Sequence, residues 1–75
     1  MRITDLEPGE VYVVVQSFRD DRGVRVLEGD RQTLDRVNAS RGSFEVVFRE
    51  ETLHLDEERQ TEVCEHAERF FRLAT

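Results

Sequence analysis

The chain has 75 residues, with 17 acidic and 11 basic side chains, a net charge of −6 and a single cysteine. This length limits it to a single small domain, residues 1–75, and one cysteine excludes an internal disulfide. No apolar run approaches the roughly 18 residues that span a membrane, and the first residues form no apolar signal region, so a cytoplasmic protein is expected. The acid excess is concentrated in residues 50–75, which argues against nucleic acid and anionic membranes as partners.

The first elements predicted are a turn, a strand and a hairpin. Pro8 and Gly9 suit the two central positions of a turn, because Pro presets φ and Gly accepts a positive φ. Residues 11–18 follow as a β-branched and aromatic strand with apolar residues on both faces, which indicates a central or sharply curled strand. Residues 19–23 are predicted to form a hairpin loop that Gly23 closes in the left-handed region.

Four further strands are predicted along the middle of the chain. Residues 24–27 return from the hairpin loop, and residues 33–38 form a weak strand. The apolar residues of that weak strand lie three apart, which leaves a bulge or a short helical turn open. Residues 43–48 form a strong strand and residues 52–55 a short one.

The last third of the sequence changes its period. Apolar residues recur three and four positions apart, which predicts an amphipathic helix over about residues 56–73. Asp56 would be the N-cap, and Phe70 and Phe71 would be buried by the helix against the sheet. The fold class predicted is therefore α+β: five short antiparallel strands within residues 11–55 form a curled, SH3-like half-barrel, and one C-terminal helix covers its open side.

One pattern of turn and core residues spans most of the chain: Leu6, Pro8, Gly9, Tyr12, Val14, Phe18, Asp20, Gly23, Glu28, Gly29, Leu55, Glu58 and Gln60. This pattern resembles a bacterial family of small proteins known as a domain of unknown function, and it is also SH3-like. Because that family has no assigned activity, the resemblance implies no catalytic residue, and the SH3-like pattern implies a binding module by analogy.

No set of residues in the sequence forms a recognisable catalytic or metal site. On a helix, Cys64 and His66 point about 200° apart and cannot share an ion. His54 and Asp56 lie two residues apart on an extended segment, where the carboxylate could adjust the basicity of the imidazole as a general base. No sequence signal, however, places a Ser or Cys nucleophile beside them. We therefore predict no enzyme activity, no catalytic or metal residues and no cofactor.

The leading interpretation is a non-enzymatic protein-interaction module. Its predicted contact surface is the acidic face of the helix or an edge of the barrel, and its partner is another protein or a second copy in a homodimer. Three alternatives stay open. One is a small metal-dependent or hydrolytic enzyme that uses His54 and nearby carboxylates, and another is a structural homo-oligomer. The third is an acidic mimic of nucleic acid that occupies the groove of a DNA-binding protein, through carboxylates such as those of Glu58, Glu62 and Glu65. The residues predicted to contact a partner are Glu58, Glu62, Glu65, His66 and Arg69.

Overall fold

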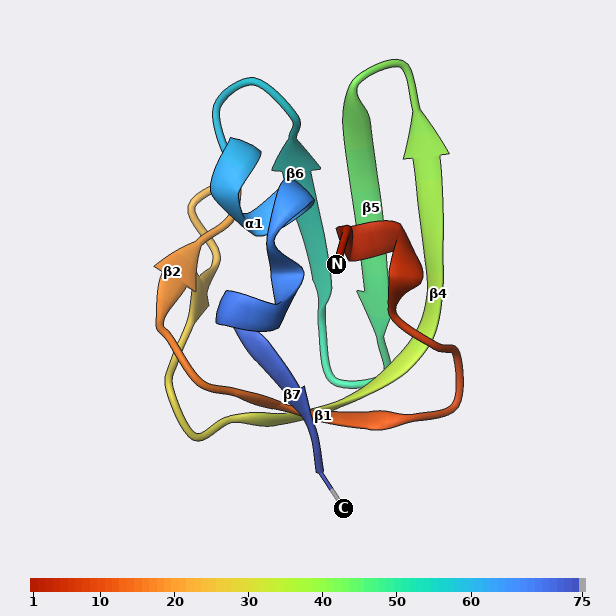
Figure 1. Ribbon diagram of the computed structural model, residues 1–75, viewed down its shortest axis with the longest axis vertical. Coiled ribbons are helices and arrows are strands. Elements are labelled where there is room, and N and C mark those ends of the chain that lie inside the picture. Colours follow the sequence, from red (N-terminus) through yellow and green to blue (C-terminus); the bar gives the residue numbers. More distant parts are fainter. Residues whose placement is uncertain (75) are drawn as a thin grey trace.

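The computed structural model describes residues 1–74, which form a mostly-β domain with one short α-helix (Figure 1). A five-stranded antiparallel sheet has the order β6-β5-β4-β1-β7, and β2 and β3 form a separate two-stranded hairpin. The bounds of the strands are β1 Val11–Val14, β2 Phe18–Arg19, β3 Arg25–Val26, β4 Arg31–Ser40, β5 Ser43–Phe48, β6 Thr52–Asp56 and β7 Phe71–Leu73. The helical segments are η1 Ile3–Asp5, α1 Thr61–Glu65 and η2 Ala67–Arg69.

The core lies between one face of the sheet and the helical segments. Alternation along β5 buries Phe44, Val46 and Phe48 and turns the residues between them outward, as a sheet with one solvated face requires. The helix α1 contacts both η1 and β6. Its buried residues, Val63 and Cys64, complete the core from that side.

The turns and most strands agree with the sequence prediction. Gly9 and Gly23 both have positive φ, and the amide of Glu10 donates to the carbonyl of Glu7 across the Pro8-Gly9 turn. The weak strand predicted over residues 33–38 is the longest strand, β4. Its register shifts between Leu34 and Arg36, so of the two alternatives left open the bulge is the one observed.

The predicted half-barrel is wrong. The sheet is open: within residues 1–74 its two outer strands, β6 and β7, do not pair with each other. The predicted return strand, residues 24–27, contributes only to the separate hairpin with β2. The fifth strand of the sheet is β7, which comes from the segment that was predicted to be helical.

The predicted helix over residues 56–73 is also wrong. Asp56 ends β6, and its Oδ1 accepts from the amides of Glu58 and Arg59, both at 3.0 Å, so it caps a turn rather than a helix. The helix α1 ends at Glu65 because the amide of Ala67, which would continue the helical ladder, donates to the carbonyl of Met1.

Phe70 and Phe71 are nevertheless both buried, as predicted. The chain leaves η2 and runs beside β1, where the amide of Val15 donates to the carbonyl of Phe70 at 2.8 Å. Phe18 packs edge-on against both aromatic rings, with centroids 5.3 and 5.8 Å away. None of the helices in the described part of the chain is long and apolar enough to cross a membrane.

Candidate functional site

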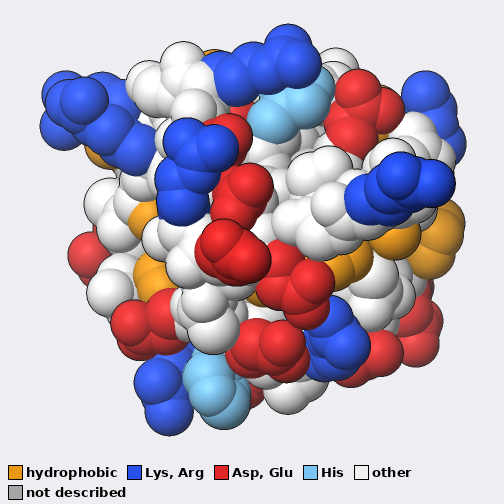
Figure 2. All heavy atoms as spheres, turned by 90° about the horizontal axis from the view of Figure 1, so that it is seen from above, with side chains coloured by type: hydrophobic (Ala, Val, Ile, Leu, Met, Phe, Trp, Pro, Cys, Tyr) orange, Lys and Arg blue, Asp and Glu red, His pale blue; other side chains and the backbone are white. Residues whose placement is uncertain are grey.

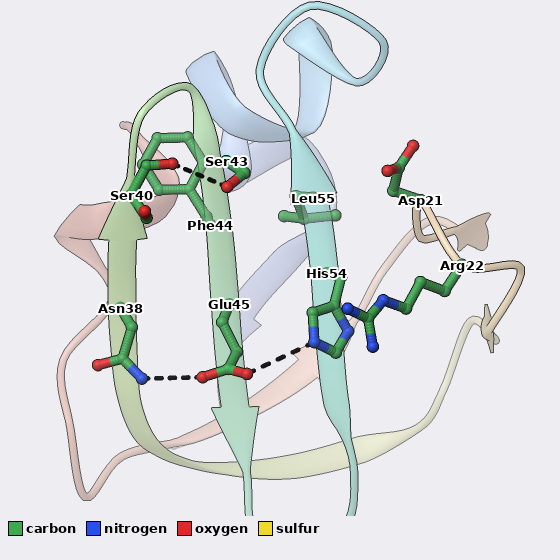
Figure 3. Close-up of a pocket in the computed structure, with 9 residues that line it drawn as sticks. All are labelled: Asp21, Arg22, Asn38, Ser40, Ser43, Phe44, Glu45, His54 and Leu55. Atoms are coloured by element: carbon green, nitrogen blue, oxygen red, sulfur yellow. Dashed lines mark hydrogen bonds and ion pairs between the residues drawn. The ribbon is translucent and has the colours of Figure 1, made fainter.

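A row of three polar side chains crosses the solvent-facing side of the sheet. Strand register places Asn38 of β4 opposite Glu45 of β5, and Glu45 opposite His54 of β6. Asn38 Nδ2 donates to Glu45 Oε1 at 2.9 Å, and His54 Nε2 lies 3.4 Å from Glu45 Oε2 (Figure 3). Both oxygens of the Glu45 carboxylate are therefore held by neighbours, one on each adjacent strand.

A cleft of about 400 Å³ surrounds this row. The loop between β2 and β3 contributes Asp21 and Arg22, and Figure 3 shows the Arg22 side chain extending toward His54. The hairpin from β4 to β5 contributes the two serines. The residues that line the cleft are Asp21, Arg22, Asn38, Ser40, Ser43, Phe44, Glu45, His54 and Leu55.

The buried carboxylate of Asp20 fixes the wall formed by the β2–β3 loop. Its Oδ1 accepts from the amides of Arg22 and Val24 at 2.9 and 2.7 Å, and its Oδ2 accepts from the amide of His54 at 2.9 Å. The amide of Asp21 in turn donates to the His54 carbonyl at 2.7 Å. These bonds join the loop to the outer edge of β6, which places Arg22 beside the cleft.

The electrostatics of the row favour an ionised Glu45. The hydrogen bond from Asn38 is the largest influence that lowers the pKa of Glu45, and His54 lowers it further, while partial desolvation acts in the opposite direction. The carboxylate is therefore a fixed negative acceptor near neutral pH. The Ser43 hydroxyl donates to the carbonyl of Ser40 at 2.8 Å, so its hydrogen is directed to the backbone and not to His54.

The five residues predicted to bind a partner do not share one helix face. Arg69 lies in η2, 3.5 Å from Glu62 of α1, and Glu58 stands exposed in the turn before α1. Glu65 lies 3.6 Å from Arg2, and His66 lies 3.7 Å from Glu68. Figure 2 shows carboxylates interspersed with arginine and histidine side chains on the face it displays. These ion pairs weaken the acidic field that the sequence predicts there.

The fold does not bring the other candidate groups together into a site. His54 and Asp56 share a face of β6, but the Asp56 carboxylate is occupied by the turn amides and by Arg59 at 3.9 Å. Cys64 is fully buried, and this burial raises the pKa of its thiol to about 11. Among residues 1–74, no group of three or more His, Cys, Asp or Glu side chains is placed to hold a metal ion.

The sequence interpretation did not include Asn38, Glu45 or Arg22 in a site. One local signal was present: Arg41 and Gly42 form a two-residue turn in which both φ angles are positive, 33° and 77°. Such a turn sets the register of its hairpin, and here that register places Asn38 beside Glu45.

These features define the chain as a small mostly-β domain with a polar cleft on the outer face of its sheet. No protein-family model matches the chain, and no curated protein matches it. Among solved structures it is similar to VCH_CASS4, an integron cassette protein from the mobile metagenome of Vibrio cholerae. The TM-score is 0.86 at 26% sequence identity, and the match covers 91% of this chain and 87% of that chain. The resemblance to a bacterial domain of unknown function stays a prediction.

Proposed function

We propose that the protein is a non-enzymatic interaction module that binds a partner protein through the cleft over β4, β5 and β6. The observation that carries this proposal is the carboxylate of Glu45, which Asn38 and His54 hold in one orientation before any partner arrives. A group that is already ordered loses little conformational entropy on binding, so it suits recognition.

The partner group that fits the cleft best is a basic side chain. The ionised Glu45 favours positive charge, and its carboxylate retains lone pairs for a further donor. Asp21, on the cleft wall, is already paired with Arg59 at 3.5 Å. The side chains of Phe44 and Leu55 are buried on the core face of the sheet, so the cleft offers mainly polar contacts. Arg22 lies on the wall next to His54, where its positive charge would repel a basic side chain. The basic side chain of the partner would therefore enter from the side of Asn38 and Ser40.

A titration of the ¹⁵N-labelled protein with N-acetyl-arginine amide and with N-acetyl-glutamate amide tests this proposal. We expect the arginine probe to shift the amides of Ser43, Glu45 and His54, and the Glu45→Gln variant to lose most of the shift. Glu28→Gln is the matched control, because Glu28 is exposed and lies outside the cleft. Equal responses to both probes, or an unchanged response in Glu45→Gln, would refute the proposal.

A second candidate is a small hydrolytic or metal-dependent enzyme. The observation that favours it is the 3.4 Å approach of the Glu45 carboxylate to His54, since a carboxylate that orients an imidazole is a common arrangement for a general base. A thermal-shift series with Zn²⁺, Mn²⁺ and Mg²⁺ separates the two candidates. Stabilisation by one of these ions that Glu45→Gln abolishes would favour the metal-dependent enzyme over the interaction module.

The charged surface that the sequence predicted remains a proposed secondary contact. Glu58 is exposed there, whereas Glu62 and Glu65 are each close to an arginine of the same chain. Charge reversal at Glu58 is therefore expected to weaken partner binding more than reversal at Glu62. Affinities measured at two salt concentrations for a captured partner would test this ranking.

A further inference from the structure

The cleft over β4, β5 and β6 contains an arginine that stands outside the ion pairs of the described chain. Arg22 lines the cleft from the loop between β2 and β3. It takes part in none of the ion pairs formed within residues 1–74. The carboxylate of its neighbour Asp21 lies 3.5 Å from Arg59 instead. The Arg22 guanidinium is therefore a positive charge that is available to a partner.

The backbone of Arg22 is fixed beside strand β6. The buried carboxylate of Asp20 accepts from the amide of Arg22 with Oδ1 and from the amide of His54 with Oδ2, both at 2.9 Å. The next residue, Gly23, has a φ of 85°, which lets the chain turn away directly after Arg22. The base of the Arg22 side chain is thus ordered before a partner binds, and Figure 3 shows this side chain extending toward His54.

Across the strands, the charge that lines the cleft changes from negative to positive. Glu45 of β5 lies opposite His54 of β6, and the loop that carries Arg22 is bonded to the outer edge of β6. Neighbouring strands lie about 4.8 Å apart, so the backbones of Glu45 and Arg22 are separated by about two such spacings, roughly 10 Å. The two charges are therefore close enough for one partner segment to contact both.

We propose that the cleft recognises a partner segment in which an acidic residue lies two positions from the basic residue that contacts Glu45. This inference rests on the proposed function and adds a second residue to the recognised motif. In an extended segment, residues two positions apart point to the same side and lie about 7 Å apart, and the length of the side chains covers the remaining distance. The acidic side chain would accept from the Arg22 guanidinium, which can donate two parallel hydrogen bonds to a carboxylate.

The charges of the chain argue for this pattern and against a purely basic segment. A second basic residue at the same spacing would lie against Arg22, and like charges repel. The net charge of the chain is −6, so its overall field disfavours an acidic residue anywhere on the surface. A measured preference for an acidic residue at the second position would therefore report a local positive charge.

The test compares two peptides in titrations of the full ¹⁵N-labelled chain: acetyl-Gly-Arg-Ser-Glu-Gly-amide and the same peptide with Gln in place of Glu. The variant Arg22→Gln removes the guanidinium and keeps the backbone amide that Asp20 binds. Arg25→Gln is the matched control, because it changes the net charge by the same amount and Arg25 is an exposed residue of β3 that does not line the cleft. Glu45→Gln tests the proposed function in the same titrations.

We expect the Glu peptide to bind about threefold more tightly than the Gln peptide, which is the effect of one exposed ion pair. This ratio should fall to about one in Arg22→Gln and persist in Arg25→Gln, while Glu45→Gln should weaken the binding of both peptides. If both peptides bind the native chain equally, or if Arg22→Gln and Arg25→Gln change the ratio equally, this inference is overturned and the proposed function stands. If neither peptide binds, or if Glu45→Gln leaves both affinities unchanged, the proposed function fails and this inference fails with it.

Discussion

Replacing Asp20 with alanine is expected to destabilise the fold by about 3 kcal/mol. Asp20 is only 5% exposed, and its carboxylate accepts three backbone amides, those of Arg22, Val24 and His54, at 2.7–2.9 Å. A hydrogen bond to a charged group contributes about 1.5–3 kcal/mol. Because the loop is partly exposed and water can replace some of these bonds, we take about 1 kcal/mol for each.

Urea unfolding followed by far-ultraviolet circular dichroism measures this change directly. For a chain of this length, a loss of about 3 kcal/mol lowers the melting temperature by more than about 10 °C. Asp35→Ala is the matched control, because Asp35 is exposed and pairs with its neighbour Arg36. Its effect should stay within about 0.5 kcal/mol.

Two further measurements test whether the carboxylate of Asp20 anchors the loop between β2 and β3. Asp20→Asn keeps one acceptor oxygen and should lose about half as much stability as Asp20→Ala. Amide exchange at Val24 and His54 should accelerate in Asp20→Ala before global unfolding, because the hairpin is released from β6 first. If Asp20→Ala and Asp35→Ala have the same stability, the carboxylate does not anchor this loop and the account of the cleft wall is wrong.

Three other predictions follow from burial and charge. The thiol pKa of Cys64 rises from 9.0 to about 11 on folding, so the free energy of unfolding should fall by about 2 kcal/mol between pH 9 and 11. The Cys64→Ala variant should lose this pH-dependent component. A thiol reagent at pH 8 should modify Cys64 only when the protein unfolds. The pKa of Glu45 is lowered in the fold, so its ionised carboxylate stabilises the fold above about pH 4.5 and this contribution is lost as pH falls. In urea titrations, the free energy of unfolding of Glu45→Gln should therefore fall less steeply at acidic pH. Phe71→Ala should cost about 3–4 kcal/mol in urea unfolding, and a loss below about 1 kcal/mol would contradict its place in the core.

The sequence alone did not predict that the residues of the polar cleft lie together. Glu45 and His54 are nine residues apart, and their proximity depends on the hairpin between β5 and β6, which turns at Arg49–Glu50. The position of Asn38 beside Glu45 depends on the preceding hairpin, which turns at Arg41–Gly42. The turn residues Arg41 and Gly42 were the local signal for the register that pairs Asn38 with Glu45. Arg22 could not be placed in this way, because the loop that carries it reaches β6 only through the buried carboxylate of Asp20.

Local sequence patterns were enough to predict the turns, most strand positions, and the burial of Phe70 and Phe71. Each of these depends on local properties: the φ values that Pro and Gly allow, the alternation of side chains along a strand, and the cost of exposing large apolar groups. The tertiary structure alone decided whether residues 66–73 continue a helix. Their apolar spacing suits a helix, yet β1 offers free backbone groups along its edge, and the chain satisfies these by forming β7. Pairing between segments about 60 residues apart outweighs a local period, because unpaired backbone groups cost more than the small differences in helix propensity.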